Sequence, residues 1–315
     1  MSDIIMQKFN TAKRIAVFSH IRPDADAFGS ALALYAALTK QGKEVGLFVD
    51  DVLPSKFIFL KHYNLYNTKE LKDFDLLIAC DCSDLERLGQ YASDFRKHKN
   101  TINIDHHKTN TRFGEINHVM PAYASTCEII LEILENCNVK LNFDIALPLY
   151  CGMSTDTGNF MYSNTNERTF LSAYKLIKYI KDISPYIYEL YKKTSVNRTK
   201  LLGHVLGNIK MYCDNKLAIL VIRNKDLVEF DVPSYESEGF VDYAINIDTV
   251  QIGICMLESS EKSFKISMRS REKDVAIICD HFGGGGHKFA AGCKLDGYFE
   301  DVLEKLVKTV GLTIS

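Results

Sequence analysis

The first half of the chain alternates short apolar runs with longer segments whose apolar residues recur at helical spacing. The short runs have the length of β-strands. We expect strands at Arg14–Ser19, Glu44–Val49, Asp75–Ala79 and Thr101–Ile104. We expect helices at Ser30–Gly42, Pro54–Tyr63 and Leu85–Lys97. This alternation predicts an α/β domain with a mostly parallel sheet and helices on both faces.

Helical spacing continues after the last of these strands. We expect helices from Ser125 or Thr126 to Cys137, from Asp144 to Met153, and from Glu167 to Ile180. The sequence from Pro185 to Met211 is still helical but more polar, so we interpret it as a connector. The chain is therefore divided into a first domain at residues 1–184, a helical connector at 185–211 and a second domain at 212–315.

The second half of the chain has a different pattern, with strands more frequent than helices. We expect strands at Leu217–Ile222, Gln251–Leu257, Ser263–Met268 and Ala290–Leu295. We expect helices at Asp274–His281 and Phe299–Val310, and a loop at the four glycines Gly283–Gly286. This order predicts a smaller α+β domain of about 100 residues.

The charge of the chain limits the partners that it can hold. The 38 Lys and Arg residues and 40 Asp and Glu residues give a net charge of −2. Long nucleic acids are not expected partners, because their binding depends on counterion release by many cations. A few cations are enough for a mononucleotide or a short oligonucleotide, so these partners stay open.

The sequence contains no signal of a membrane or secreted protein. The apolar run Ala31–Leu38 is far too short to span a bilayer, and the first ten residues lack the plan of a signal peptide. The nine cysteines form no even framework, which favours a reducing cytoplasm. Cys80 and Cys82 are one candidate thiolate pair for zinc, but no second pair accompanies them, so core packing is preferred.

Four clusters of His and Asp lie where apolar runs give way to turns. The carboxyl ends of parallel strands, where several of these clusters lie, are the places at which open α/β sheets bind ligands. Carboxylates this close repel one another unless cations neutralise them. The clusters offer two imidazoles and four carboxylates as metal ligands: His20, Asp24, Asp26, Asp81, His106 and Asp156. We therefore predict a site for two divalent cations in a metal-dependent hydrolase.

The mixture of ligands indicates the metal. An excess of carboxylate over imidazole favours Mn²⁺, followed by Mg²⁺ or Co²⁺. Asp81 is the expected bridging ligand, because a lone carboxylate at a strand end can face both ions. Each cluster by itself has a plainer interpretation as a turn, a helix cap or a surface pair. Their combination at one edge of a sheet favours the metal site.

Four ordered motifs resemble those of the DHH phosphoesterase superfamily. They are HIRPDADAFGS at 20–30, DCSD at 81–84, DHH at 105–107 and STDTGNF at 154–160. The run GGGGHKFAAG at 283–292 is similar to the glycine signature of the DHH-associated C-terminal domain. The resemblance covers essentially the whole chain and points to the stand-alone nanoRNase and pAp phosphatase branch. Ala25, where a glycine is frequent, is a mild departure.

The resemblance implies a role for each motif residue. One Mn²⁺ would be held by His20, Asp24 and Asp81, and the other by Asp26, Asp81, His106 and Asp156. Asp105 would orient the neighbouring histidines, and His107 would act on the scissile phosphate instead of binding metal. The implied reactions are hydrolysis of short oligoribonucleotides to mononucleotides and removal of the 3′-phosphate from pAp to give AMP.

The second domain is expected to bind the phosphates of the substrate. Glycines let backbone N–H groups approach a phosphate closely, although a glycine run alone is more typical of a flexible turn. Arg269 and Arg271 are two residues apart at a strand end, so both are expected on one face, where they could pair phosphate bidentately. With the resemblance, the predicted substrate-binding residues are Arg269, Arg271, Gly285, Gly286 and His287.

Two other functions stay open at this stage. A cyclic-di-AMP or pApA phosphodiesterase would use the same metal centre. A non-catalytic nucleotide-binding sensor would keep the fold without turnover, but the complete set of candidate ligands argues against it. The sequence does not decide between a monomer and a homodimer, or the direction in which an oligonucleotide would be degraded.

Overall fold

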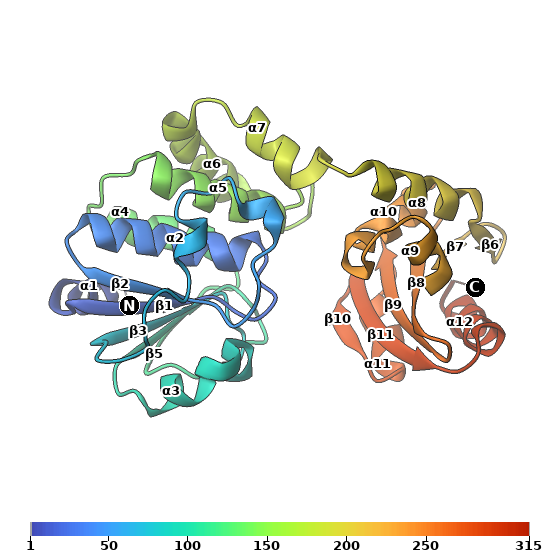
Figure 1. Ribbon diagram of the computed structural model, residues 1–315, viewed down its shortest axis with the longest axis horizontal. Helices are drawn as coiled ribbons and strands as arrows, with labels where there is room; N and C mark the ends of the chain where they lie inside the picture. Colours follow the sequence, from blue (N-terminus) through green and yellow to red (C-terminus); the bar gives the residue numbers. More distant parts are fainter. Residues whose placement is uncertain (1, 315) are drawn as a thin grey trace. The chain divides into compact units, whose positions relative to one another are not determined.

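The structure is a computed structural model that describes residues 2–314. The chain forms two compact units, Met1–Lys193 and Thr194–Ser315, which Figure 1 colours from blue to yellow-green and from yellow to red. Each unit has its own sheet and its own buried core. Each therefore has the parts of an independent domain.

The first unit is built on a five-stranded sheet in which all neighbouring strands are parallel, in the order β2-β1-β3-β4-β5. The strands are β1 (Arg14–Phe18), β2 (Glu44–Phe48), β3 (Leu76–Cys80), β4 (Thr101–Asp105) and β5 (Ile116–Val119). The central strands β1, β3 and β4 are buried along almost their whole length, as parallel strands covered on both faces must be. The predicted α/β fold is confirmed.

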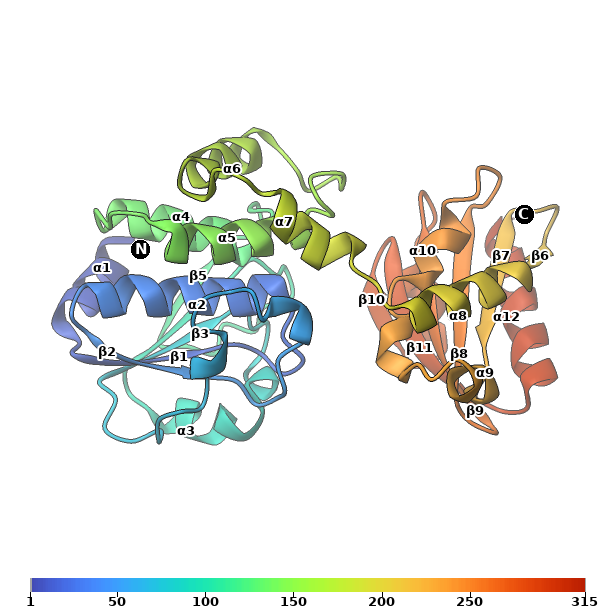
Figure 2. The same ribbon diagram turned by 45° about the horizontal axis from the view of Figure 1, so that its top comes forward.

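Helices cover both faces of this sheet, as Figures 1 and 2 show. One face is covered by α1 (Ser2–Thr11), α2 (Ala25–Lys40), α4 (Thr126–Asn136) and α5 (Phe143–Asp156), with α6 (Glu167–Ile180) packed against α5. The other face is covered by α3 (Ala92–Lys97) and the 3₁₀ segment Leu85–Tyr91. The carboxyl edge of the sheet is thus left to the loops that follow the strands.

Three predicted helices of this unit differ from the structure. Of the helix predicted at Leu85–Lys97, only Ala92–Lys97 is α-helical, because the chain kinks at Gly89, with φ of 58°, within the 3₁₀ segment. α2 begins at Ala25 and not at Ser30, because the Asp24 side chain caps it by accepting two backbone hydrogen bonds. The helix predicted at Pro54–Tyr63 is wrong. Within that range the chain forms only short 3₁₀ turns, and its buried side chains Phe57 and Leu60 explain the apolar spacing without a helix.

Two further elements were not predicted. α1 lies in the N-terminal segment and buries Ile5 and Phe9 in the core of the unit. β5 extends the sheet beyond β4, but only four residues pair there and two of them, Asn117 and His118, are polar. A strand this short gives little apolar signal.

The second unit contains a six-stranded mixed sheet in the order β10-β11-β9-β8-β7-β6. The strands are β6 (Lys210–Tyr212), β7 (Leu217–Ile222), β8 (Ile252–Ser260), β9 (Ser263–Ser270), β10 (Gly285–His287) and β11 (Ala290–Asp296). β7 and β8 are parallel, and the other neighbouring pairs are antiparallel. The expected α+β domain is confirmed, although part of the predicted glycine loop forms the edge strand β10.

Two groups of helices cover the faces of this second sheet. One face is covered by α11 (Val275–His281) and α12 (Phe299–Ile314). The other is covered over β7 and β8 by α8 (Val196–Gly207), α9 (Asn224–Glu229) and α10 (Phe240–Ile245). The short helices α9 and α10 were not predicted.

The segment interpreted as a connector is largely helical. α7 (Ser184–Ile187) and a π-helical turn at Tyr188–Lys192 belong to the first unit, whereas α8 buries Leu201 and Val205 in the second. Throughout residues 2–314, every helix is too short or too polar to cross a membrane.

Candidate metal centre

Three neighbouring strands bring the first group of predicted ligands to one edge of the sheet. His20 follows β1, Asp81 follows β3, and Asp105 ends β4 and leads directly into His106 and His107. β1, β3 and β4 are adjacent in the sheet, so their carboxyl ends meet although the residues are distant in sequence. Asp81 adopts a left-handed backbone conformation, with φ of 60°, which turns the chain sharply at the strand end.

Two helices supply the remaining predicted ligands. Asp24 and Asp26 lie at the start of α2, and Asp156 is the last residue of α5. α2 and α5 approach closely at Gly152, where an added Cβ would come within 2.8 Å of the Cα of Asp26 and would also meet the Cys127 sulfur. Because Gly152 has no side chain, α2 and α5 can lie close together, and these helices carry the predicted ligands Asp26 and Asp156.

Asp81 lies beside two sets of predicted ligands, one around His20 and one around His106. Its Oδ2 lies 3.6 Å from Nε2 of His20, and its Oδ1 lies 3.6 Å from Nε2 of His106. The ligand atoms of His20, Asp24 and Asp81 lie within 4.8 Å of one another, and so do those of Asp26, His106 and Asp156. Asp81, His106 and His107 form a third such group, so the geometry alone does not separate His107 from the predicted ligands. One carboxylate with an oxygen towards each group has the geometry expected of a bridging ligand.

Hydrogen bonds outside the ligand groups fix two of the side chains. Nδ1 of His20 lies 2.7 Å from the Ile21 carbonyl oxygen, which suits a neutral ring whose Nε2 is left as the acceptor. Asp26 accepts hydrogen bonds from the backbone N–H groups of Thr126 (2.6 Å) and Cys127 (2.8 Å) at the start of α4. The Thr126 hydroxyl also donates to Asp81 at 2.8 Å.

The positioning role of Thr126 was missed at the sequence level. The sequence indicated Ser125 or Thr126 as a helix cap, and Ser125 is indeed the capping residue, accepting from the backbone of Glu128. Nothing in the sequence shows that the same helix start is aimed at Asp26 and Asp81, since that contact joins residues 100 positions apart.

The pKa values show how strongly the acidic groups interact. Burial, followed by the charges of Asp156 and Asp81, raises the pKa of Asp26 well above its usual value. Burial also raises the pKa of Asp156, to about 6, although the His106 hydrogen bond opposes this. Burial alone would raise the pKa of Asp81 as well, but the neighbouring histidines, first of all His20, lower it to about 2.

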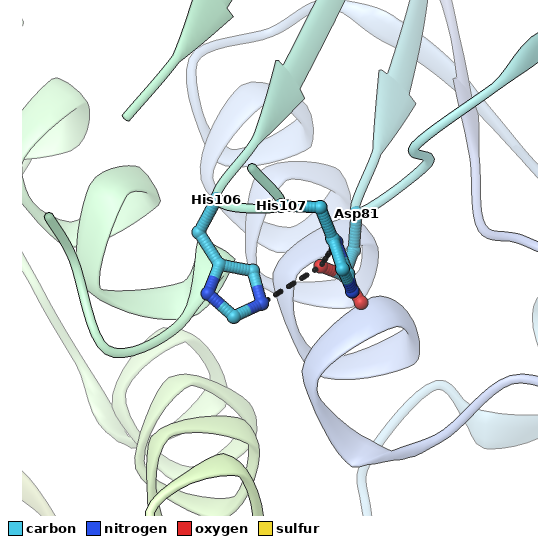
Figure 3. A group of neighbouring side chains, drawn as sticks. All are labelled: Asp81, His106 and His107. Carbon is cyan, nitrogen blue, oxygen red and sulfur yellow. Dashed lines mark ion pairs between the residues drawn. The ribbon is translucent and has the colours of Figure 1, made fainter. Parts of the chain in front are cut away.

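His107 is held differently from the two predicted histidine ligands. Figure 3 shows it beside His106 and Asp81, and its Nδ1 lies 2.8 Å from Oδ1 of Asp105. Asp105 also accepts from the His106 backbone N–H at 2.9 Å, so it orients both histidines. Burial by itself would lower the pKa of His107, but the Asp105 hydrogen bond and the Asp81 charge raise it above its usual value.

A divalent cation fits this donor set. Carboxylate oxygens and imidazole nitrogens face one another across a partly buried space, and their mutual repulsion is what a bound cation would relieve. The oxygen-rich set with a minority of nitrogen suits hard or borderline metals. The two buried cysteines near Asp81, Cys80 and Cys82, contribute to the apolar clusters on opposite faces of the sheet, so neither joins the metal groups.

Arg87 is a second residue beside the site whose position is not apparent from the sequence. Its backbone carbonyl accepts from the Ile21 N–H at 2.8 Å, and its positive charge acts on His20. Within residues 2–314, its Nε is buried without a hydrogen-bond partner. The Arg87 guanidinium, close to the metal ligand His20, thus has a donor at Nε that is still able to form a hydrogen bond.

The two arginines predicted to bind substrate have different surroundings. Nε of Arg269, on β9, lies 3.3 Å from Oδ1 of Asp242 in α10. Arg271 lies beyond the end of β9, and its guanidinium donates to the carbonyl oxygens of Ile245 (2.9 Å) and Ile247 (3.3 Å). Arg271 therefore caps the C-terminus of α10.

The predicted glycine residues lie at the edge of the second sheet. Gly285, Gly286 and His287 form the exposed strand β10, which pairs with β11. Gly286 has a φ of 145°, and a Cβ there would come within 2.6 Å of the Cα of Ala291. Only glycine fits this close approach of two strands.

Comparisons with known proteins agree with this arrangement. The sequence matches the models of the DHH family N-terminal domain over residues 14–153 and of the DHHA1 domain over residues 214–315. It is 31% identical over 304 residues to the bifunctional oligoribonuclease and PAP phosphatase NrnA of Thermus thermophilus, covering 92% of this chain and 88% of that protein. It is 28% identical to the Bacillus subtilis protein of the same name, covering 91% and 90%.

A solved structure extends the similarity to three dimensions. The crystal structure of an exopolyphosphatase-related protein from Bacteroides fragilis superposes with a TM-score of 0.91 at 27% identity. The match covers 98% of this chain and 94% of that one. Both units of the chain therefore have counterparts in one solved protein.

Proposed function

The chain belongs to the DHH family and carries a DHHA1 domain, and we propose that it hydrolyses short oligoribonucleotides to mononucleotides and dephosphorylates pAp to AMP. It is a DHH/DHHA1 phosphoesterase related to the NrnA proteins. The observation that carries the proposal is the pair of ligand groups that share Asp81 at one sheet edge. The names of the relatives support the choice of substrates.

Two divalent cations, Mn²⁺ first among them, fit the two groups. His20, Asp24 and Asp81 would hold one, and Asp26, Asp81, His106 and Asp156 would hold the other. When bound, such ions supply an activated water and neutralise charge on the phosphoryl group. The backbone N–H groups of α4 would keep Asp26 in place, and the Thr126 hydroxyl would do the same for Asp81.

His107 is proposed as the proton donor to the leaving oxygen. Its Nδ1 is engaged by Asp105, so its Nε2 is the atom left to face a substrate. The Asp105 hydrogen bond and the Asp81 charge raise the pKa of His107, which favours the protonated ring that a general acid requires. Asp105 would hold the ring in orientation without contacting substrate.

The second unit is proposed to bind a substrate phosphate through Arg269, Gly285, Gly286 and His287. Asp242 lies beside Nε of Arg269, and Nη1 donates to the Met268 carbonyl oxygen at 3.1 Å, so Nη2 is the nitrogen that we expect to pair with phosphate. Arg271 is occupied with backbone carbonyl groups. We expect Arg269→Lys to raise KM for 5′-phosphorylated substrates and Arg271→Lys to leave it unchanged; the reverse result would exchange the two roles.

A substrate panel tests the proposed function. The purified chain is stripped with chelator, reloaded with Mn²⁺, Mg²⁺ or Co²⁺, and assayed on 5′-phosphorylated di- to pentanucleotides, pAp, pApA and cyclic-di-AMP. We expect turnover of the short oligonucleotides and of pAp, with Mn²⁺ most effective. If only cyclic-di-AMP or pApA is cleaved, the protein is instead a cyclic-dinucleotide pathway phosphodiesterase. If all substrates stay intact, a nucleotide-binding sensor becomes the better account.

A further inference from the structure

Two cysteines of the second unit meet where α11 packs against β11. Cys279 lies in the last turn of α11, and Cys293 lies on β11. Both thiols are free, and both residues belong to the apolar cluster on this face of the sheet. The Cys279 thiol forms a hydrogen bond with the Cys293 sulfur, so the two side chains contact each other across the helix–strand interface.

The same two cysteines contact Gly284, the residue that leads into β10. The Gly284 N–H donates to the Cys279 carbonyl oxygen at 2.8 Å. A Cβ at Gly284 would come within 2.5 Å of the Cys293 Cβ, so this glycine has no spare room on the side of β11. A movement of one cysteine towards the other is therefore transmitted to Gly284.

The two thiols differ in their tendency to ionise. The hydrogen bond from Cys279 lowers the pKa of Cys293, as does the Lys305 ammonium on α12, although burial opposes both. The same hydrogen bond, together with burial, raises the pKa of Cys279. Cys293 is also 7% exposed, whereas Cys279 is fully buried. Cys293 is thus favoured as the thiolate that attacks an oxidant, and Cys279 stays protonated beside it.

We propose that Cys279 and Cys293 are a modification site at which a peroxide forms a disulfide, and that this disulfide distorts the glycine segment Gly283–Gly286. In the first step the Cys293 thiolate attacks one peroxide oxygen, which gives a sulfenic acid and releases the other oxygen as water or an alcohol. The Cys279 thiol then attacks the sulfenic sulfur, so that the S–S bond forms and water leaves. The two thiols lose two electrons, and the peroxide gains them.

The disulfide changes the edge of the sheet that carries the proposed phosphate site. A disulfide brings its two sulfur atoms to about 2.05 Å, much closer than two hydrogen-bonded thiols. α11 and β11 therefore have to approach at a point where Gly284 leaves no room. The next residues, Gly285–His287, form β10, and their pairing with β11 weakens. The effect on substrate rests on the function proposed above, because it requires phosphate binding at this strand.

Tryptic peptides detect the disulfide directly. Trypsin cleaves at lysines on both sides of each cysteine, so residues 274–288 carry Cys279 and residues 289–294 carry Cys293. The full-length chain is treated with hydrogen peroxide in chelator, then alkylated and digested. We expect the two peptides to be joined with the loss of two hydrogens, and to separate after treatment with dithiothreitol. If the joined peptide does not form, the proposal is overturned.

Hydrogen exchange and kinetics test the effect on the glycine segment. We expect oxidation to speed deuterium uptake in residues 274–288. After reloading with Mn²⁺, KM for pAp should rise about tenfold, as for the loss of one charge-assisted phosphate contact. Cys279→Ser should abolish both effects of oxidation, whereas Cys213→Ser, which changes a half-buried cysteine of the same unit, should keep them.

The outcomes separate the two proposals. A joined peptide with unchanged exchange would show that the disulfide does not distort the glycine segment. Faster exchange with an unchanged KM for pAp would show that the disulfide does not act on the phosphate site. If the reduced chain cleaves no substrate while oxidation still joins the peptides and speeds exchange, the proposed function alone fails.

Discussion

Nε2 of His106 lies 3.1 Å from Oδ2 of Asp156, at the place where both would hold one metal ion. Burial alone would lower the pKa of His106, but Asp156, Asp81 and Asp26 raise it to about 10. Without metal, the ring therefore carries a proton on the acidic side of that value. A proton and a metal ion compete for the same nitrogen.

We therefore predict that Mn²⁺ binding releases protons at pH 7.5, about one of them from His106. The pKa of His106 in the folded protein is raised to about 10, so below that pH the ring carries a proton. A metal ion that binds the same nitrogen must displace this proton. The apparent affinity for Mn²⁺ should consequently increase as pH rises towards 10. Calorimetric titrations in two buffers of different ionisation enthalpy measure the release. Equal heats in both buffers would show that the ring is already neutral.

Asp81→Asn removes the negative charge of the proposed bridging ligand while keeping the backbone conformation of the turn. Asn tolerates the left-handed conformation at φ of 60°, so the turn after β3 should persist. We predict a loss of at least about 100-fold in kcat, with fewer Mn²⁺ ions bound per chain. Asp84→Asn is the matched control, because it changes a nearby capping Asp to an equally good cap. Full activity in Asp81→Asn would remove the bridging role.

The role of His107 as proton donor can be tested by assaying His107→Ala on two substrates, one whose leaving group needs a proton and one whose leaving group does not. We expect kcat to fall by roughly 100- to 10,000-fold on oligonucleotides, whose leaving alkoxide needs a proton. The p-nitrophenolate released from a p-nitrophenyl phosphodiester is a weak base and leaves without a proton. The kcat for that substrate should therefore fall much less. Equal losses on both substrates would indicate that His107 binds metal or substrate instead.

The glycine between α2 and α5 predicts a stability effect linked to the metal centre. A Cβ at Gly152 would press on the Asp26 backbone, so Gly152→Ala should destabilise the fold by about 1–3 kcal/mol and weaken Mn²⁺ binding. Gly203→Ala in α8 is the control, since nothing lies within 4 Å and the exposed helix should gain about 0.5–1 kcal/mol. Thermal unfolding with and without Mn²⁺ measures both. If Gly152→Ala changed neither the stability nor Mn²⁺ binding, α2 and α5 would be able to move apart without cost.

Elements with a strong local signal could be predicted from the sequence. The strands that carry His20, Asp81 and Asp105 are nearly continuous apolar runs, because parallel strands are buried on both faces. Their adjacency then follows from the topology of α/β sheets, which is why residues distant in sequence could be assigned to one site.

Features that depend on tertiary contacts could not be predicted. The segment around Phe57 has apolar residues at helical spacing, but they are buried by packing against α2 and its neighbours without forming a helix. The contact of Asp26 with the start of α4 and the capping of α10 by Arg271 join elements far apart in the chain. No local pattern records such pairings.

The most direct test of the metal centre is anomalous scattering from crystals grown with Mn²⁺. Our account predicts two peaks in the first unit. One should contact His20, Asp24 and Asp81, and the other Asp26, His106 and Asp156, with Asp81 touching both. An empty site with the carboxylates turned away from one another, or a single peak without contact to Asp81, would contradict it.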